Sequence, residues 1–161
     1  MARAVTKVIL DGYVGKGIGE ICGNKFDSPQ QNHCAHFVSH VLDIQLGVLC
    51  GDMEYTTRHT GASIRCDELY NRLPSRGDWD DAPDNTDGLL MFVTLTNNMA
   101  GTLMGNAPRK HVGIVLSGCV YNFGNSGHAV RREPTVDAFK KRMGGAYGGM
   151  DKVSFFYAVP Q

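Results

Sequence analysis

The segment QNHCAHFVSHVLD, residues 31–43, places one cysteine and three histidines close together in the chain. These residue types support two kinds of chemistry. A cysteine thiolate attacks carbonyl carbon atoms when a base lies within reach, and cysteine and histidine together are the usual ligands of zinc. The segment therefore predicts either a cysteine nucleophile or a metal site, and the rest of the chain has to supply the partners.

Cys34 lies at the start of the strongest helical pattern in the sequence. Asn32 is the expected N-cap, and Phe37, Val38 and Val41 form an apolar stripe on the same face as Cys34. Unpaired amides and the positive end of the helix dipole favour a thiolate in the first turn. Cys34 is therefore predicted to be a nucleophile that points at the sheet, with its own backbone amide as an oxyanion donor.

A base for this thiolate is predicted at the head of a strand. His111 opens the apolar segment HVGIVLS, and Ser117-Gly118 forms a tight turn into CVYNFG. A two-residue turn places Asn122 on the face of His111, one diagonal step away, where its amide oxygen can orient the imidazole. A three-residue turn would bring Asn125 opposite His111 instead, so Asn125 is the alternative to Asn122.

The histidine-rich segment also has a second interpretation, a non-enzymatic zinc-binding or interaction module built on His33, Cys34, His36 and His40. His36 and His40 are four residues apart and share one helix face. A structural zinc ion needs four ligands, however, and no second pair of cysteine or histidine residues has the usual spacing. We therefore expect no metal and no other cofactor, and histidines that make ordinary hydrogen bonds.

The elements that position these residues are predicted to be helices first and strands later. This order indicates an α+β fold, a single domain over residues 1–161 in which N-terminal helices pack on a mostly antiparallel sheet. Ser63 is expected to cap the third helix, and Pro134 to occupy the first position of the fourth. The predicted helices cover residues 4–13, 33–46, 63–73 and 134–142, and the predicted strands cover residues 89–95, 111–117, 119–124 and 152–159.

Composition excludes some classes of partner. Lys and Arg number 16, as do Asp and Glu, so the net charge of zero gives no general attraction for nucleic acid or acidic membranes. The apolar run before Asp11 is too short for a signal-peptide core or a membrane span. We expect a protein synthesised in soluble form in the cytoplasm without a signal peptide. The other four cysteines are expected to be reduced, inert core thiols: Cys22, Cys50, Cys66 and Cys119.

The order of these motifs resembles that of the NlpC-type cell-wall peptidases of the papain-like superfamily. NHCAHFVSHVL resembles their cysteine-bearing helix start, GLLMFVTL the strand before the histidine, and KHVGIVLSGCVYNF the histidine strand with its hairpin. The resemblance covers roughly residues 30–125. It implies a papain-like fold and an amidase or endopeptidase acting on peptidoglycan stem peptides, with Cys34 as nucleophile, His111 as general base and acid, and Asn122 as the residue that orients His111.

A small amidase of this kind, without a cell-wall-binding repeat, also resembles the peptidoglycan amidase effectors exported by type VI secretion. This resemblance implies an antibacterial protein that acts in the periplasm of a target cell and is neutralised at home by an immunity protein. The residues themselves are also compatible with papain-like chemistry on a protein isopeptide or an acyl substrate.

Overall fold

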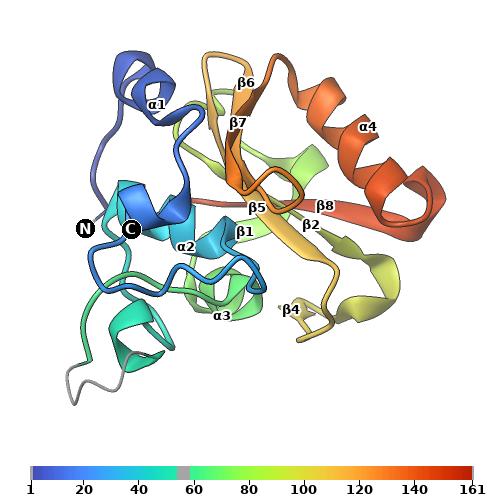
Figure 1. Cartoon of the computed structure of the whole chain (residues 1–161). Helices are drawn as coiled ribbons and strands as arrows, with labels where there is room; N and C mark the ends of the chain where they lie inside the picture. Colours follow the sequence, from blue (N-terminus) through green and yellow to red (C-terminus); the bar gives the residue numbers. More distant parts are fainter. Residues whose placement is uncertain (1, 54–58, 161) are drawn as a thin grey trace.

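The computed structural model describes residues 2–53 and 59–160. The prediction of an α+β fold is confirmed, because helices pack on a mostly antiparallel sheet (Figure 1). The α-helices of the described residues are α1 (Lys7–Tyr13), α2 (Cys34–Leu42), α3 (Cys66–Arg72) and α4 (Val136–Ala146). The short 3₁₀ helices are η1 (Ile18–Glu20), η2 (Cys50–Met53), η3 (Trp79–Asp81), η4 (Thr96–Asn98) and η5 (Met150–Lys152).

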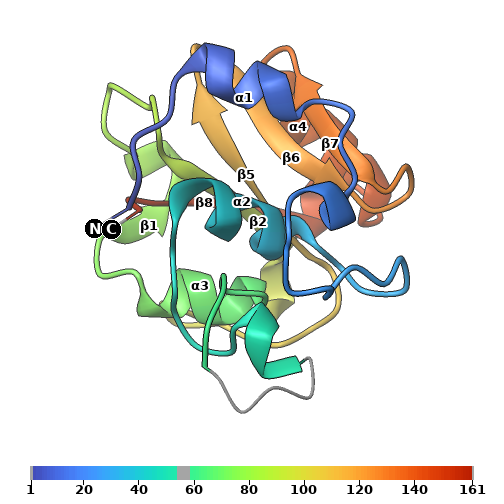
Figure 2. The same ribbon diagram turned by 60° about the vertical axis from the view of Figure 1, so that its left-hand side comes forward.

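The main sheet has the strand order β1-β8-β2-β5-β6-β7, and every neighbouring pair is antiparallel. A separate small sheet consists of β3 and β4. The strands are β1 (Arg76–Asp78), β2 (Leu90–Leu95), β3 (Met99–Ala100), β4 (Leu103–Met104), β5 (Lys110–Leu116), β6 (Cys119–Gly124), β7 (Ala129–Glu133) and β8 (Val153–Ala158). Helices α2 and α3 cover one face of the sheet and α4 covers the other (Figures 1 and 2).

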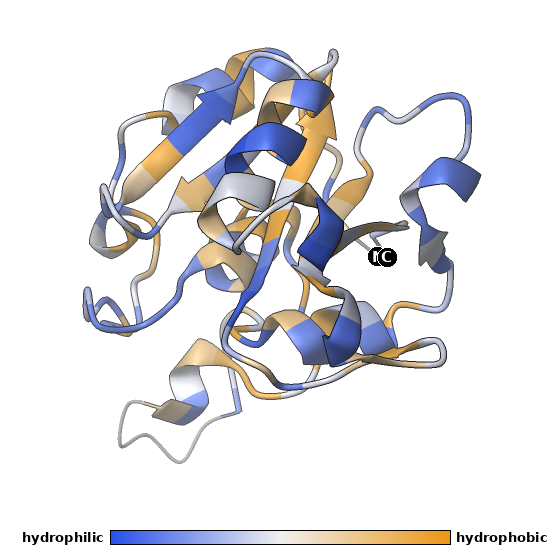
Figure 3. Cartoon of the chain, turned by 90° about the vertical axis from the view of Figure 1, so that its right-hand side faces the viewer, coloured by the Kyte–Doolittle hydropathy of each residue, from blue (hydrophilic) through white to orange (hydrophobic). Residues whose placement is uncertain are grey.

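Both faces of the central strands are buried, which explains why β2 reads as a continuous apolar run. Leu90 and Phe92 belong to the core under α2 and α3, whereas Met91 and Val93 belong to the core under α4. Figure 3 shows hydrophobic residues along the strands inside the molecule and hydrophilic residues over much of the outer loops. The central strands can therefore hold a polar side chain only where it has a hydrogen-bonding partner.

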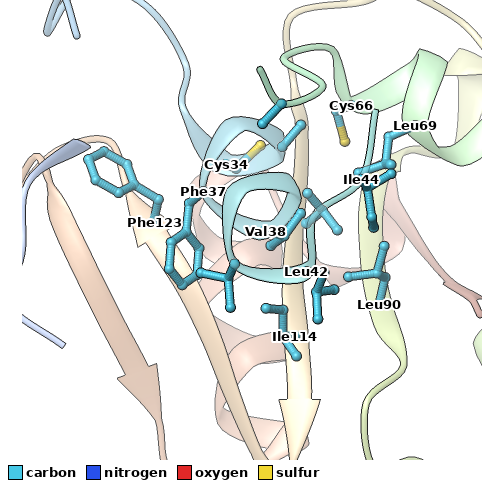
Figure 4. Close-up of a cluster of buried hydrophobic side chains, with 14 of the residues drawn as sticks. Cys34, Phe37, Val38, Leu42, Ile44, Cys66, Leu69, Leu90, Ile114 and Phe123 are labelled. Carbon is cyan, nitrogen blue, oxygen red and sulfur yellow. The ribbon is translucent and has the colours of Figure 1, made fainter. Parts of the chain in front are cut away.

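Helix α2 is buried on almost every side, since His40 is its one residue that is only partly buried. Its apolar stripe packs on the sheet, with Val38 and Leu42 directed toward Ile114 and Leu90 in Figure 4. The helix ends at Asp43, whose backbone is left-handed with φ of 59°. The predicted stripe is thus confirmed, but α2 stops earlier than the sequence indicated.

Two predicted helix starts are wrong, the cap Ser63 and the first position Pro134. Helix α3 begins at Cys66 rather than after Ser63, because the Ser63 hydroxyl accepts from the amide of Leu46 at 2.6 Å and donates to a carbonyl of the preceding segment. Helix α4 begins at Val136, and Thr135 is its cap, accepting from the amide of Ala138. Both true helices start two or three residues later than predicted.

The hairpin between β5 and β6 follows the predicted register. Ser117 and Gly118 both have positive φ, 51° and 77°, as a two-residue type I′ turn requires. Leu116 therefore lies opposite Cys119, and the pairing continues to Gly113 opposite Asn122. Strand β7, in contrast, was not predicted, because its sequence AVRRE is largely polar.

None of the helices in the described ranges has the length and hydropathy needed to cross a membrane.

Candidate active site

Cys34 is the first residue of α2 and lies against the start of β5. Its Sγ atom lies 4.0 Å from the carbonyl oxygen of Lys110, and the Val112 amide and the His111 imidazole both hydrogen-bond to it. Only 1% of Cys34 is exposed. Gly113 is the first residue of β5 that pairs with β6. The start of α2 therefore lies against the part of β5 that precedes Gly113, where β5 is not paired with β6.

The imidazole of His111 lies between Cys34 and Asn122. Its Nε2 atom is 2.8 Å from Asn122 Oδ1, and an amide oxygen only accepts, so Nε2 carries a proton. Nδ1 is thereby left to face Cys34, which hydrogen-bonds to the same ring. The ring stacks on Phe139 of α4, with centroids 6.0 Å apart and planes inclined by 25°. The histidine is therefore held by a hydrogen bond on one edge and an aromatic ring on one face.

The surroundings of Cys34 favour its ionised form. The neighbouring Cys66 thiol, and after it the hydrogen bond and positive charge of His111 and the Val112 amide, hold the pKa of Cys34 well below its usual range, although burial opposes them. Cys66 shows the opposite behaviour, since burial and the adjacent Cys34 raise its pKa. The thiolate belongs on Cys34 because the imidazole and the helix start face Cys34.

His111 responds to the same pairing. Burial on its own lowers the pKa of this histidine, but the hydrogen bond and charge of Cys34, followed by Asn122 Oδ1 and the charge of Glu133, more than offset burial, and the pKa lies above its ordinary value. A lowered thiol pKa beside a raised imidazole pKa favours a thiolate–imidazolium pair. Such a pair is the resting form of an activated cysteine nucleophile.

Cys66 is the residue of this site that sequence reasoning missed. It was expected to be an inert core thiol, yet as the first residue of α3 it lies beside Cys34, and both sulfur atoms are drawn in Figure 4. No spacing rule connects two cysteines on separate helices. The one signal in the sequence was that both residues fall in the first turn of a predicted helix.

Cys34 lines a cleft of about 530 Å³ between the start of α2, the start of α3 and the segment before β5. The lining is mostly polar and carries both signs of charge. Lys110 and Asp67 lie across from one another, with Nζ and Oδ1 separated by 3.9 Å. Other polar residues of the cleft are Gln31, Asn32, Arg65 and Asn106. This cleft is the opening through which a substrate can approach the thiolate.

A second pocket, of about 380 Å³, lies on the α4 side of His111. Asn122, Arg142 and Tyr147 contribute to its walls. This second pocket thus reaches the His111 imidazole, whereas the first cleft reaches the Cys34 thiol from the other side.

Asn32 has a different position from the one predicted. His33 occupies the N-cap position without making a side-chain cap bond. Asn32, the residue before it, accepts a hydrogen bond from the Cys34 amide through Oδ1 at 3.0 Å. Asn32 Nδ2 also donates to the Lys110 carbonyl at 3.3 Å. Asn32 therefore joins the start of α2 to β5. The prediction that the Cys34 amide is a free oxyanion donor is wrong, because Asn32 already engages it.

The remaining candidates lie away from the thiol. Asn125 Oδ1 accepts from the backbone amide of His33 at 3.4 Å, whereas Asn122 takes the position beside His111. The two ring nitrogens of His33 face Ser28 O at 2.7 Å and His36 Nδ1 at 3.0 Å. His33 and Cys34 therefore do not converge with His36 and His40 on one point, and the zinc site suggested by the sequence is not formed by those four residues.

Comparison with family models, with curated proteins and with solved structures found no match to this chain. The geometry of the site therefore supplies the grounds for a function.

Proposed function

We propose that this protein is a cysteine amidase or peptidase of papain-like type, with Cys34 as nucleophile, His111 as general base and acid, and Asn122 as the residue that orients His111. The observation that carries the proposal is the position of the His111 imidazole, bonded through Nε2 to Asn122 Oδ1 at 2.8 Å and through its other edge to the Cys34 thiol. A nucleophile, a base and an orienting group in this order are what covalent catalysis by a thiol requires.

The proposed reaction starts from the thiolate–imidazolium pair. The Cys34 sulfur attacks the carbonyl carbon of an amide, and the carbonyl oxygen takes the negative charge. The carbon–nitrogen bond then breaks as His111 Nδ1–H gives its proton to the departing amine, leaving a thioester. Water, deprotonated by the neutral His111, attacks the thioester, and the carbon–sulfur bond breaks. The acid product leaves, and the thiolate and the imidazolium are restored.

The proposed substrate is a stem peptide of peptidoglycan. The cleft beside Cys34 carries Arg65 and Lys110 together with Asp67, which suits a short peptide with both carboxylate and ammonium groups. The order of motifs that resembles the NlpC-type enzymes supports the same class. The setting that goes with this substrate, an antibacterial effector delivered by type VI secretion and held in check by an immunity protein, rests on resemblance and is part of the proposal.

A second candidate substrate is an isopeptide between proteins, which presents the same amide to the thiolate. The polar lining of the cleft favours either peptide substrate over a long acyl chain, because an acyl chain needs apolar walls.

The test uses purified muropeptides, with products identified by mass spectrometry. The wild type is expected to cleave one amide bond, and Cys34→Ala to abolish cleavage. Cys119→Ser is the matched control, since Cys119 is a free thiol on β6 outside this site. Cleavage by Cys34→Ala at the wild-type rate would exclude the proposed nucleophile. Cleavage of an isopeptide-linked protein but of no muropeptide would keep the chemistry and replace the substrate.

A further inference from the structure

A second group of reactive side chains lies around α2, apart from Cys34. Cys22, His36, His40 and Cys50 each place one ligand atom here, and these atoms all lie within 4.8 Å of one another. His40 is partly exposed and the other three are buried. We propose that these four residues bind one zinc ion as a structural site that holds α2 in position.

The spacing fits a tetrahedral ion after a small contraction. Zinc bonds of about 2.3 Å to sulfur and 2.0–2.1 Å to nitrogen place the ligand atoms of a tetrahedron roughly 3.3–3.8 Å apart. Cys50 Sγ and His40 Nε2 already lie 3.6 Å apart. The remaining pairs lie within 4.8 Å, so a pair of sulfur atoms needs to close by at most about 1 Å and a pair of nitrogen atoms by at most about 1.5 Å, which side-chain rotation can supply.

The hydrogen bonds of His36 leave a free lone pair in this group. The carbonyl of Ser28 accepts only, so the His33 nitrogen 2.7 Å away carries the proton. In neutral His33 the other nitrogen, Nδ1, is therefore an acceptor, and His36 Nδ1, 3.0 Å away, must donate to it. His36 Nε2 is then unprotonated. It is also completely buried and has no hydrogen-bonding partner.

An unpartnered buried nitrogen of this kind is costly unless something binds it. A zinc ion at the centre of the group would satisfy it. The chain from Ser28 through His33 to His36 is also the arrangement found behind metal-bound histidines, in which the second ring nitrogen donates to a fixed acceptor and so orients the ligand.

The two sulfur atoms are surrounded by N–H donors. Cys50 Sγ accepts from Asn24 Nδ2 at 3.2 Å and from the Ala62 amide at 3.3 Å. The backbone amides of Asn24 and Phe26 hydrogen-bond to Cys22. A neutral thiol is a weak acceptor, whereas a metal-bound thiolate is commonly held by such donors. Two thiolates, two neutral imidazoles and Zn²⁺ also sum to zero charge, which a buried site tolerates.

A disulfide between Cys22 and Cys50 is the competing use of these sulfur atoms. It would leave His36 Nε2 buried without a partner, and it gives no reason for His40 to lie beside Cys50. Zinc accounts for all four side chains together. Four protein ligands also fill a tetrahedral ion, so the site is structural rather than catalytic.

The ion would join three segments that are distant in sequence. Cys22 follows η1, His36 and His40 belong to α2, and Cys50 opens η2. Because α2 carries Cys34 at its first residue, an ion there would fix the helix that presents the thiol. The ion itself takes no part in the proposed reaction.

The direct test is the metal content of protein purified without a polyhistidine tag, in reducing buffer free of chelators. About one zinc ion per chain is expected. Replacement of zinc by Co²⁺ should give sulfur-to-cobalt charge-transfer bands and the visible bands of a tetrahedral ion. Less than about 0.1 zinc per chain after incubation with zinc chloride would overturn the proposal, as would a Cys22–Cys50 disulfide in freshly purified protein.

Variants assign the ligands. Cys22→Ser with Cys50→Ser, and separately the milder His40→Gln, are expected to lose most of the bound zinc. Cys119→Ser and His128→Gln are the matched controls and should keep about one ion. If the double variant does not fold, the cobalt spectrum of the wild type still decides. Retention of zinc by both ligand variants would place the metal elsewhere.

The same measurements separate this proposal from the proposed enzymatic function. Cys34→Ala should keep its zinc and lose muropeptide cleavage. Loss of zinc from Cys34→Ala would mean that Cys34 is itself a ligand, which contradicts the assigned site. A wild-type protein that binds zinc but cleaves no amide would refute the enzymatic function alone.

Discussion

The side chain of Asn122 on β6 accepts a hydrogen bond from Nε2 of His111 on β5 at 2.8 Å, across two strands joined by a two-residue turn. Both side chains are buried. The turn therefore sets the position of the imidazole, and through it the face that the imidazole presents to Cys34.

Removing this hydrogen bond should reduce turnover more than substrate binding. In Asn122→Ala the imidazole loses its fixed tautomer, and we expect kcat to fall by about 10²-fold with a KM close to that of the wild type. Asn122→Asp should retain part of the activity, since a carboxylate still accepts from Nε2. Steady-state kinetics with a purified muropeptide measures both values. Unchanged kcat in Asn122→Ala would show that Asn122 does not orient His111.

The pH profile of kcat/KM should be bell-shaped. It should span a wider pH range than the profile of a cysteine and a histidine with ordinary pKa values. On the acid side, activity appears as pH rises through the lowered pKa of Cys34, because the thiolate forms there. On the alkaline side, activity is lost as pH rises through the raised pKa of His111, because the imidazolium that protonates the leaving amine disappears. Alkylation of Cys34 by iodoacetamide should follow the acid limb alone, and a reaction rate that first rises near the pKa of a free thiol would contradict this.

Cys66 should tune the thiolate without being essential. Its thiol is the largest influence that lowers the pKa of Cys34, so Cys66→Ala should move the acid limb of the profile to higher pH and slow alkylation of Cys34 below neutral pH. Cys66→Ser, which keeps an O–H donor, should shift the limb less. Cys119→Ala is the control and should leave the limb in place. The idea fails if the acid limb of Cys66→Ala coincides with that of the wild type.

Gly61 offers a test of the packing around the proposed zinc ligands. Its φ is +101°, and a Cβ atom there would collide with Cys50 Sγ and with Asn24 Nδ2. Gly15 has a similar φ of +90°, but a Cβ atom added to it would meet nothing within 4 Å. Gly61→Ala should therefore destabilise the protein by about 1–3 kcal/mol more than Gly15→Ala, the additional cost being that of overpacking.

Urea unfolding of the two glycine variants, with and without added zinc, checks this difference. Gly61→Ala should also bind zinc more weakly than the wild type, whereas Gly15→Ala should bind it equally well. Equal free energies of unfolding for the two variants would show that the segment around Cys50 yields readily to an added methyl group.

Local features of the chain were predictable because they depend on neighbours in sequence. The apolar stripe of α2 and the runs that form β2, β5, β6 and β8 follow from periodicity. The Ser117-Gly118 turn requires positive φ at two successive residues, and its length decides which face Asn122 occupies. The sequence thus narrowed the partner of His111 to Asn122 or Asn125, and the observed two-residue turn selects Asn122.

Helix boundaries were less predictable because several polar residues compete for the same role. Asn32, Ser63 and Thr135 can each accept a hydrogen bond from a free amide at a helix start, and Thr135 does so for α4. The Ser63 hydroxyl instead accepts from the amide of Leu46, and Asn32 bonds the Cys34 amide from the residue before the N-cap. Strand β7 was missed because an edge strand needs few apolar residues, and its pairing with β6 depends on tertiary contacts.

The sequence by itself determined a helix with Cys34 in its first turn, a tight turn that places Asn122 or, in the longer form, Asn125 beside His111, and an α+β order of elements. Tertiary structure alone decided that Cys66 lies beside Cys34, and that Cys22 and Cys50 meet His36 and His40 around α2. The physical reason is that hydrophobic periodicity and turn geometry act over a few residues, whereas side chains from separate loops and helices converge only when the core packs.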